Sequence, residues 1–96
     1  SVSSSKNSIL LSIKKTEALI KLGNTTDAEE LLKKTEASVV QDKNTLYYKA
    51  LIAMNYGALY QNQGRNDLAI EQFQLALDNL EQDKRSANLE AAERHL

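Results

Sequence analysis

The stretch Asn55 to Leu80, NYGALYQNQGRNDLAIEQFQLALDNL, decides the fold of this 96-residue chain. It predicts two helices that run back to back and are joined by a turn at Gly64. Small residues stand where the two helices must approach each other, and larger apolar residues fill the space around them. The small residues are Gly57, Ala58, Ala69 and Ala76, and the larger ones are Tyr56, Tyr60, Phe73, Leu77 and Leu80. One such pair cannot bury its apolar faces alone, so the stretch predicts further copies of itself.

The amino-acid composition limits which fold classes and which kinds of partner are expected. Twelve basic and thirteen acidic side chains leave a formal charge of −1, which gives no electrostatic footprint for nucleic acid or an anionic membrane. Cysteine is absent, so we expect no disulfide, thiol nucleophile or zinc knuckle, and a reducing, cytoplasmic compartment fits. No apolar run approaches the roughly 18 residues that span a membrane. Because proline is absent and glycine occurs only three times, we predict an all-α fold.

Apolar periodicity predicts about five helices, over residues 9–22, 26–39, 45–63, 66–80 and 86–96. Ser8 is a plausible N-cap of the first helix, and residues 1–8 are expected to be a flexible leader, a cloning edge or the tail of an upstream linker. Thr26 and Glu29 match a capping box at the start of the second helix. The polar segments Gln41–Asn44 and Glu81–Arg85 are predicted to separate helices.

The sequence repeats itself at an offset of 41 positions. This offset aligns Gly23 with Gly64 and Ala28 with Ala69, which are residues at turns and at helix contacts. The predicted units are a first repeat over residues 9–43, a second over 44–84, and a partial third repeat or capping helix over 85–96. Terminal repeats commonly need such a cap to cover their apolar face.

The second repeat resembles the tetratricopeptide repeat family, in a long-period variety. The resemblance is carried by the spacing of Tyr56, Gly57, Tyr60, Gly64, Ala69, Phe73 and Ala76, and by Gly23 and Ala28 in the first repeat. The first repeat departs further from the pattern, because Lys15 and Thr16 stand at the positions of Tyr56 and Gly57. The resemblance implies an α-α superhelix of antiparallel helix pairs that binds other proteins.

The resemblance also implies a binding groove on a concave face, lined by the first helix of each repeat. Carried over residue by residue, this face holds Leu10, Ile13, Glu17, Ile20, Lys21, Leu51, Met54, Ala58, Gln61 and Asn62. Such a groove fits an extended segment or an amphipathic helix, with Met54 as an adaptable contact. The alternative is that the apolar members pack against neighbouring helices and that Gln61 and Asn62 are simply solvated.

Some members of the family clamp a peptide carboxylate, and Asn55 stands at the position of one clamping asparagine. We do not expect the full clamp here. Ile13 and Glu17 occupy the positions of the other clamping residues. A glutamate at that place repels a carboxylate ligand.

No residue pattern in the chain indicates catalysis, a metal site or a cofactor. Neither Gly57 nor Gly64 follows a strand or precedes a Gly-Lys-Ser/Thr motif, so neither belongs to a phosphate-binding loop. We therefore predict a non-enzymatic protein-interaction module of a larger scaffold, sensor, signalling or regulatory protein, whose partner is a protein or peptide. The alternative is a self-association element that forms a homodimer. An RNA-binding helical repeat would need a cationic face, which the charge balance does not provide.

Overall fold

The computed structural model describes residues 2–39 and 44–94, with side chains from residue 8 onward. Within these residues the fold is all-α, as predicted. The helices are α1 Val2–Lys21, α2 Thr25–Ala37, α3 Thr45–Asn62 and α4 Asn66–Arg94. No helix of this described part is long and apolar enough to cross a membrane.

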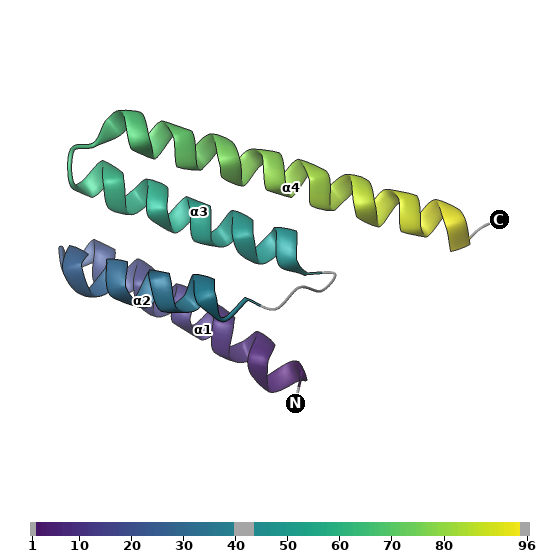
Figure 1. Ribbon diagram of the computed structural model, residues 1–96, viewed down its shortest axis with the longest axis horizontal. Coiled ribbons are helices and arrows are strands. Elements are labelled where there is room, and N and C mark those ends of the chain that lie inside the picture. The colour runs from purple at the N-terminus through teal and green to yellow at the C-terminus, as the bar shows by residue number, and fades with distance from the viewer. Residues whose placement is uncertain (1, 40–43, 95–96) are drawn as a thin grey trace.

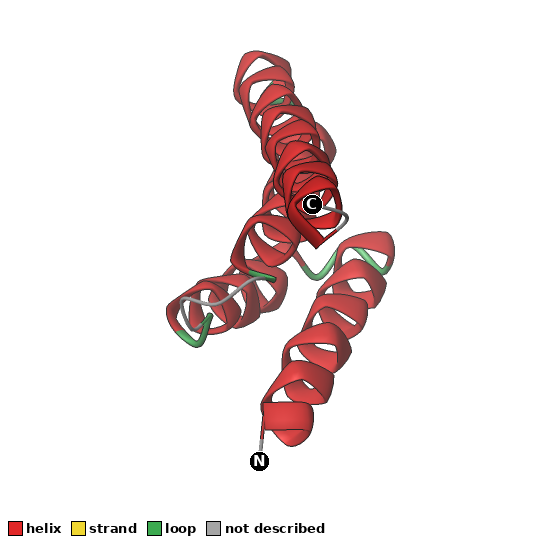
Figure 2. Cartoon of the chain, turned by 90° about the vertical axis from the view of Figure 1, so that its right-hand side faces the viewer, coloured by secondary structure: helices red, strands yellow, loops and turns green. Residues whose placement is uncertain are grey.

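The helices form two antiparallel pairs, α1 with α2 and α3 with α4 (Figure 1). Helix α3 is the central element, because it also packs against α1 and α2. In the view of Figure 2, α4 lies above α3, and α1 and α2 lie side by side below it. Within the described chain α4 contacts α3 alone. The superhelical stacking that the family resemblance implies is compatible with this order but stays a prediction.

The two interhelical turns repeat each other bond by bond at the predicted offset. Gly23 and Gly64 have left-handed φ angles of 81° and 75°. The amide of Asn24 donates to the carbonyl of Leu19 at 2.8 Å, and the amide of Arg65, 41 positions later, donates to Tyr60 at 2.8 Å. Both turns therefore end a helix with the same glycine-dependent pair of hydrogen bonds, which satisfies carbonyls that the helix leaves unpaired.

The core consists of three clusters that all include residues of α3. The first joins Ile9, Ile13, Leu32, Tyr48 and Ile52; the second joins Ile20, Ala28 and Leu59; the third joins Ala50, Ala53 and Ala76. Small side chains in the third cluster let α3 and α4 approach closely. Ala28 and Ala69, aligned by the repeat, are both buried, and so are Thr35 and Ala76. The small positions of the repeat therefore serve the same packing role twice.

The close approach at Gly57 is made by a different neighbour than the sequence pattern suggests. The ring of Phe73, and not a small residue such as Ala69, is nearest to Gly57: a Cβ built on Gly57 would lie 2.5 Å from Cε1 of Phe73. Tyr56 and Tyr60, on the same helix, stack with ring centroids 6.1 Å apart and are only half-buried. The guanidinium of Arg65 lies 5.1 Å from the centre of the Tyr60 ring.

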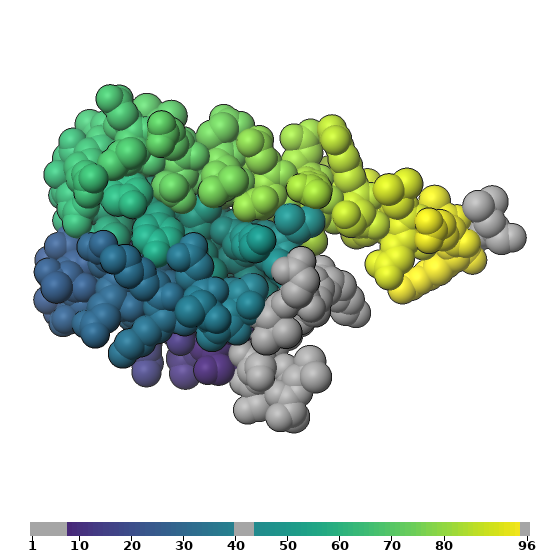
Figure 3. All heavy atoms as spheres, in the orientation of Figure 1, coloured from purple at the N-terminus to yellow at the C-terminus, as the bar shows by residue number. Residues whose placement is uncertain are grey.

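The predicted break at Glu81–Arg85 does not occur. Helix α4 continues to Arg94, so the described chain has four helices rather than about five, and residues 85–94 form no separate capping helix. The segment contains neither glycine nor proline, and an ion pair of 3.6 Å joins Glu81 to Arg85 across the predicted break. Figure 3 shows this part of α4 extending beyond the body of the molecule. Residues 95–96 lie outside the described residues.

Two other predicted boundaries also differ. Helix α1 begins at Val2 and not after Ser8, because residues 2–7 include no glycine or proline that would break it. The N-cap position of α2 belongs to Asn24 instead of Thr26, and it has no side-chain capping hydrogen bond. The predicted break at Gln41–Asn44 falls largely on residues 40–43, which lie outside the described residues.

We expect Gly23→Ala and Gly64→Ala each to lower the free energy of unfolding by about 1 kcal/mol, because a side chain disfavours the left-handed conformation. A Cβ at either position meets nothing within 4 Å, so the loss is conformational and not steric. Asparagine tolerates this conformation, and Gly64→Asn should therefore cost less than Gly64→Ala. Urea unfolding of the variants measures these differences. An unchanged midpoint for Gly64→Ala would contradict the described turn.

We expect Gly57→Thr to destabilise the protein by about 1–3 kcal/mol, because the new side chain collides with Phe73. The aligned positions of the first repeat hold Thr16 and Leu32, both fully buried. Adding Phe73→Leu should therefore recover part of the loss, giving a coupling of about 0.5–3 kcal/mol in a double-mutant cycle. Thermal unfolding of the two single variants and the double variant measures it. Strictly additive losses would show that the two positions do not share this space.

Candidate functional site

The predicted groove corresponds to the line along which α1 and α3 meet. Leu10 of α1 and Leu51 of α3 are half-buried and pack against the first core cluster. Near the other end, the side-chain amide of Asn62 donates to the carbonyl of Ile20 at 3.5 Å. Two helices far apart in sequence thus share one surface, which we call the α1–α3 face.

Most of the predicted groove residues reach this surface, but three do not. Ile13 is 3% exposed and belongs to the core cluster with Leu32 and Ile52, so it supports the fold and cannot contact a partner. Asn55 is 5% exposed, and its amide group donates to the carbonyl of Leu51 at 2.9 Å. Its position therefore offers no clamp for a peptide carboxylate. Ile20 is buried as well.

The remaining predicted residues divide into an apolar and a polar part. Met54 is 45% exposed, and the half-buried side chains of Leu10, Leu51 and Ala58 lie on the same two helices. Lys21, Gln61 and Asn62, toward the helix ends, are exposed, and Glu17 is half-buried. The α1–α3 face is therefore apolar around Met54 and polar toward the turns.

Glu17 is held by a neighbour on its own helix. Its carboxylate lies 3.7 Å from the ammonium of Lys14, one turn earlier. The Lys14 side chain is exposed and the Glu17 side chain is partly exposed, and a surface pair of this kind contributes little to stability. The pair leaves the polar part of the α1–α3 face with charges of both signs.

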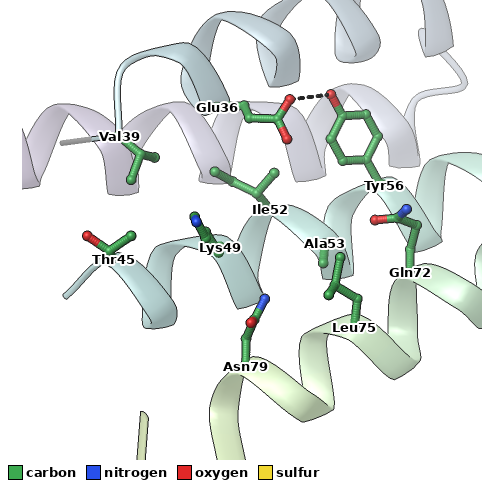
Figure 4. Close-up of a pocket in the computed structure, with 10 residues that line it drawn as sticks. All are labelled: Glu36, Val39, Thr45, Lys49, Ile52, Ala53, Tyr56, Gln72, Leu75 and Asn79. Carbon is green, nitrogen blue, oxygen red and sulfur yellow. Dashed lines mark hydrogen bonds between the residues drawn. The ribbon is translucent and has the colours of Figure 1, made fainter. Parts of the chain in front are cut away.

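A pocket of about 340 Å³ opens on another side of α3, between α2 and α4 (Figure 4). It exists because α4 does not contact α2, so α3 is left as the floor between them. Its lining residues are Glu36, Val39, Thr45, Lys49, Ile52, Ala53, Tyr56, Gln72, Leu75 and Asn79. This volume is at the lower end of the range for small-molecule sites, and the lining mixes apolar and polar groups.

Tyr56 stands at the edge of this pocket and reaches across to α2. Its hydroxyl donates to Oε1 of Glu36 at 3.4 Å, as the dashed line in Figure 4 shows. Burial of the phenol, with a smaller contribution from the carboxylate of Glu36, raises the pKa of Tyr56 from 10.0 to about 12. Both causes disfavour the phenolate. The contact therefore links the two helix pairs while Tyr56 remains a neutral hydrogen-bond donor.

Nothing in the residue pattern indicates the pocket. Its lining comes from three helices, and its polar residues, such as Gln72 and Asn79, are typical of a solvated helix face. Only the separation of α2 from α4 makes these residues neighbours, and helix periodicity does not specify that separation. The i,i+4 pairs of α2 are, by contrast, as the sequence predicts: Glu29 lies 3.3 Å from Lys33, and Glu30 lies 4.0 Å from Lys34.

The described side chains include no candidate metal centre. In this part of the chain no group of three or more histidine, aspartate or glutamate residues gathers where it could hold a metal ion. The shifted pKa of Tyr56 has a structural explanation in burial and in the contact with Glu36. What the geometry provides is contact surface: the α1–α3 face and the pocket beside α3.

We expect the stability of the protein to fall between pH 10 and about 12, because the folded state holds the Tyr56 proton more tightly than the unfolded chain does. This contribution is present in full below the unfolded pKa and is lost as the pH rises through the folded pKa. Tyr56→Phe should lose less stability than the native chain between about pH 10 and about pH 12 in urea unfolding. Glu36→Gln should lower the pKa of Tyr56 but leave it above 10, because desolvation is the larger cause. Identical pH profiles for the native chain and Tyr56→Phe would contradict the described contact.

Comparisons with known proteins assign no family to the chain. No protein-family model matches it, and no curated protein or solved structure gives a significant match. The internal repeat is therefore supported by the matching helices and turns within this chain.

Proposed function

We propose that this chain is a non-enzymatic protein-interaction module of the tetratricopeptide type. Its binding surface is the α1–α3 face, and its ligand is an extended peptide or an amphipathic helix. The observation that carries the proposal is Met54, which is 45% exposed on a helix that is otherwise the most buried of the described chain. An exposed thioether beside half-buried apolar groups offers an adaptable contact to a partner's apolar side chains.

The shape of the fold supports this proposal. The α1–α3 face is built from the first helix of each pair, and the turns that follow these helices have the same left-handed glycine and matching backbone hydrogen bonds. Because this surface is already formed in the folded chain, binding has to order the ligand segment but not the protein. The polar groups around Gln61 and Asn62 would fix the direction of a bound segment whose apolar side chains cover Met54.

A single methionine makes the proposal testable, because the Met54 methyl group gives one assigned NMR reporter on the α1–α3 face. Peptides selected from a displayed random library for binding to the chain serve as probes. We expect the bound peptide to shift the Met54 methyl signal. The methyl signals of Ile52, which lines the pocket, and Ile70, which is exposed on α4, should shift less.

Met54→Glu should weaken binding of these peptides tenfold or more, which corresponds to about 1.4 kcal/mol. Leu75→Glu is the matched control, because Leu75 is 47% exposed, close to the 45% of Met54, and lies on α4, outside the α1–α3 face. Both variants should keep the native unfolding midpoint within about 0.5 kcal/mol, since each changes an exposed side chain. Peptides that shift only Ile52 or Ile70, and whose affinity Met54→Glu leaves unchanged, would contradict the proposed surface.

A further inference from the structure

Helix α4 carries an apolar stripe that the described chain leaves open. Ile70 and Leu77 are 66% and 61% exposed, and Phe73, one turn from each, is only half-buried. The adjoining side of α4 packs against α3 through Ala69 and Ala76, and the inner edge of the Phe73 ring contacts Gly57 of α3. We call the surface of Ile70, Phe73 and Leu77 the α4 stripe. Three neighbouring apolar side chains on one helix face form the kind of patch that marks an interaction site.

The chain itself contains a template for what covers such a stripe. In the first repeat, the positions aligned with Phe73 and Leu77 are Leu32 and Glu36, 41 residues earlier. Both face α3: Leu32 shares a core cluster with Ile52, and Glu36 accepts the hydrogen bond of Tyr56. The positions of the α4 stripe are therefore those that meet the first helix of a following repeat.

The same template identifies the complementary surface on α1. Ile52 and Tyr56, the residues of α3 that meet α2, align with Leu11 and Lys15 of α1. Ile52 is 3% exposed, whereas Leu11 is 59% exposed. Helix α1 thus presents an uncovered apolar residue where α3 presents a covered one. We call the surface around Leu11 and Lys15 the outer α1 face.

The two surfaces lie on helices of opposite formal charge, as do the two surfaces that meet between α2 and α3. Seven acidic and three basic residues give α4 a charge of −4, whereas four lysines and one glutamate give α1 a charge of +3. The internal junction has the same signs, −2 on α2 and +1 on α3. Opposite charges attract when the α4 stripe meets the outer α1 face, whereas like charges repel when either surface meets a copy of itself.

We propose that the α4 stripe of one copy of this chain docks onto the outer α1 face of a second copy, so that copies stack end to end. The α2–α3 packing sets the register: Phe73 of one copy meets Leu11 of the next, and Leu77 meets the aliphatic stem of Lys15. The Lys15 ammonium then reaches the carboxylates that flank Leu77, which belong to Asp78 and Glu81. This inference is independent of the proposed α1–α3 groove.

Such an interface joins two different surfaces, so it does not close on itself in a dimer. The native chain should therefore form species larger than a dimer as its concentration rises from about 10 μM toward 1 mM in sedimentation equilibrium. The association should weaken when salt is raised, because screening reduces the attraction between the charged helices. A native chain that stays monomeric over this range, or whose association strengthens with salt, overturns the proposal.

Two variants, each blocking one surface, test the pairing directly. Leu11→Glu places a carboxylate on the outer α1 face, and Leu77→Lys places a cation on the α4 stripe. Each variant alone should be monomeric, because every junction needs both surfaces. An equimolar mixture should form a heterodimer and stop there, since the first variant keeps its α4 stripe and the second keeps its outer α1 face. Association of either variant alone, or monomers only in the mixture, overturns the proposal.

Leu75→Lys is the matched control for Leu77→Lys. Leu75 is 47% exposed on the same helix, but it lines the pocket beside α3 and lies away from the α4 stripe. This variant should associate like the native chain. Equal loss of association in Leu75→Lys and Leu77→Lys overturns the assignment to the α4 stripe. Far-ultraviolet circular dichroism confirms that all variants are folded before sedimentation.

Discussion

The contact between Gly57 and the ring of Phe73 sets the distance between α3 and α4, and the rest of the structure depends on it. No side chain fits at Gly57 while the ring holds its place. The aligned positions in the first repeat carry Thr16 and Leu32, both fully buried. Across the two repeats, a smaller residue on one helix thus accompanies a larger residue on the other. Exchanges that conserve total volume are those that packed interiors tolerate best.

Helix α3 packs against α4 through small residues, so its larger side chains pack against the other two helices. Because Ala50, Ala53 and Gly57 occupy the side toward α4, larger residues such as Tyr48 and Leu59 are directed to the α1–α2 pair. Helix α3 is therefore buried on several sides, as a central helix must be. The two surfaces described for binding also depend on it: α3 supplies half of the α1–α3 face and the floor of the pocket.

The parts of the fold that were predictable from sequence are those that one residue type controls. Gly23 and Gly64 mark the turns because few other residues adopt a left-handed φ, and the two turns share four backbone hydrogen bonds at equivalent positions. The end of α4 was not predictable from polarity. Glu81–Arg85 looks like a connection, but charged residues without glycine or proline continue a helix as readily as they end it.

The candidate site was predictable in part, for a related reason. Helix periodicity places Leu10, Leu51 and Met54 on the first helices of their repeats, but it does not fix which side each helix turns toward its neighbours. Ile13 lies one turn from Ile9, and both enter the core. Burial of Asn55 depends on how α3 is rotated between its three neighbours, which is a tertiary property. The pocket follows from the gap between α2 and α4, and that gap leaves no mark in the sequence.

The two proposed surfaces reinforce each other geometrically. Stacking by the α2–α3 template places α1 of the next copy beside α3 as α3 lies beside α1, so the α1–α3 face would continue from copy to copy. A ligand segment that spans two copies would then bind with the avidity of linked sites, and it would stabilise the stack in turn. Weak contacts around Met54 in one copy would gain strength from their repetition. Assembly through α4 would in this way set the affinity of the proposed groove, and the Gly57–Phe73 contact holds α4 in the position on which both proposals depend.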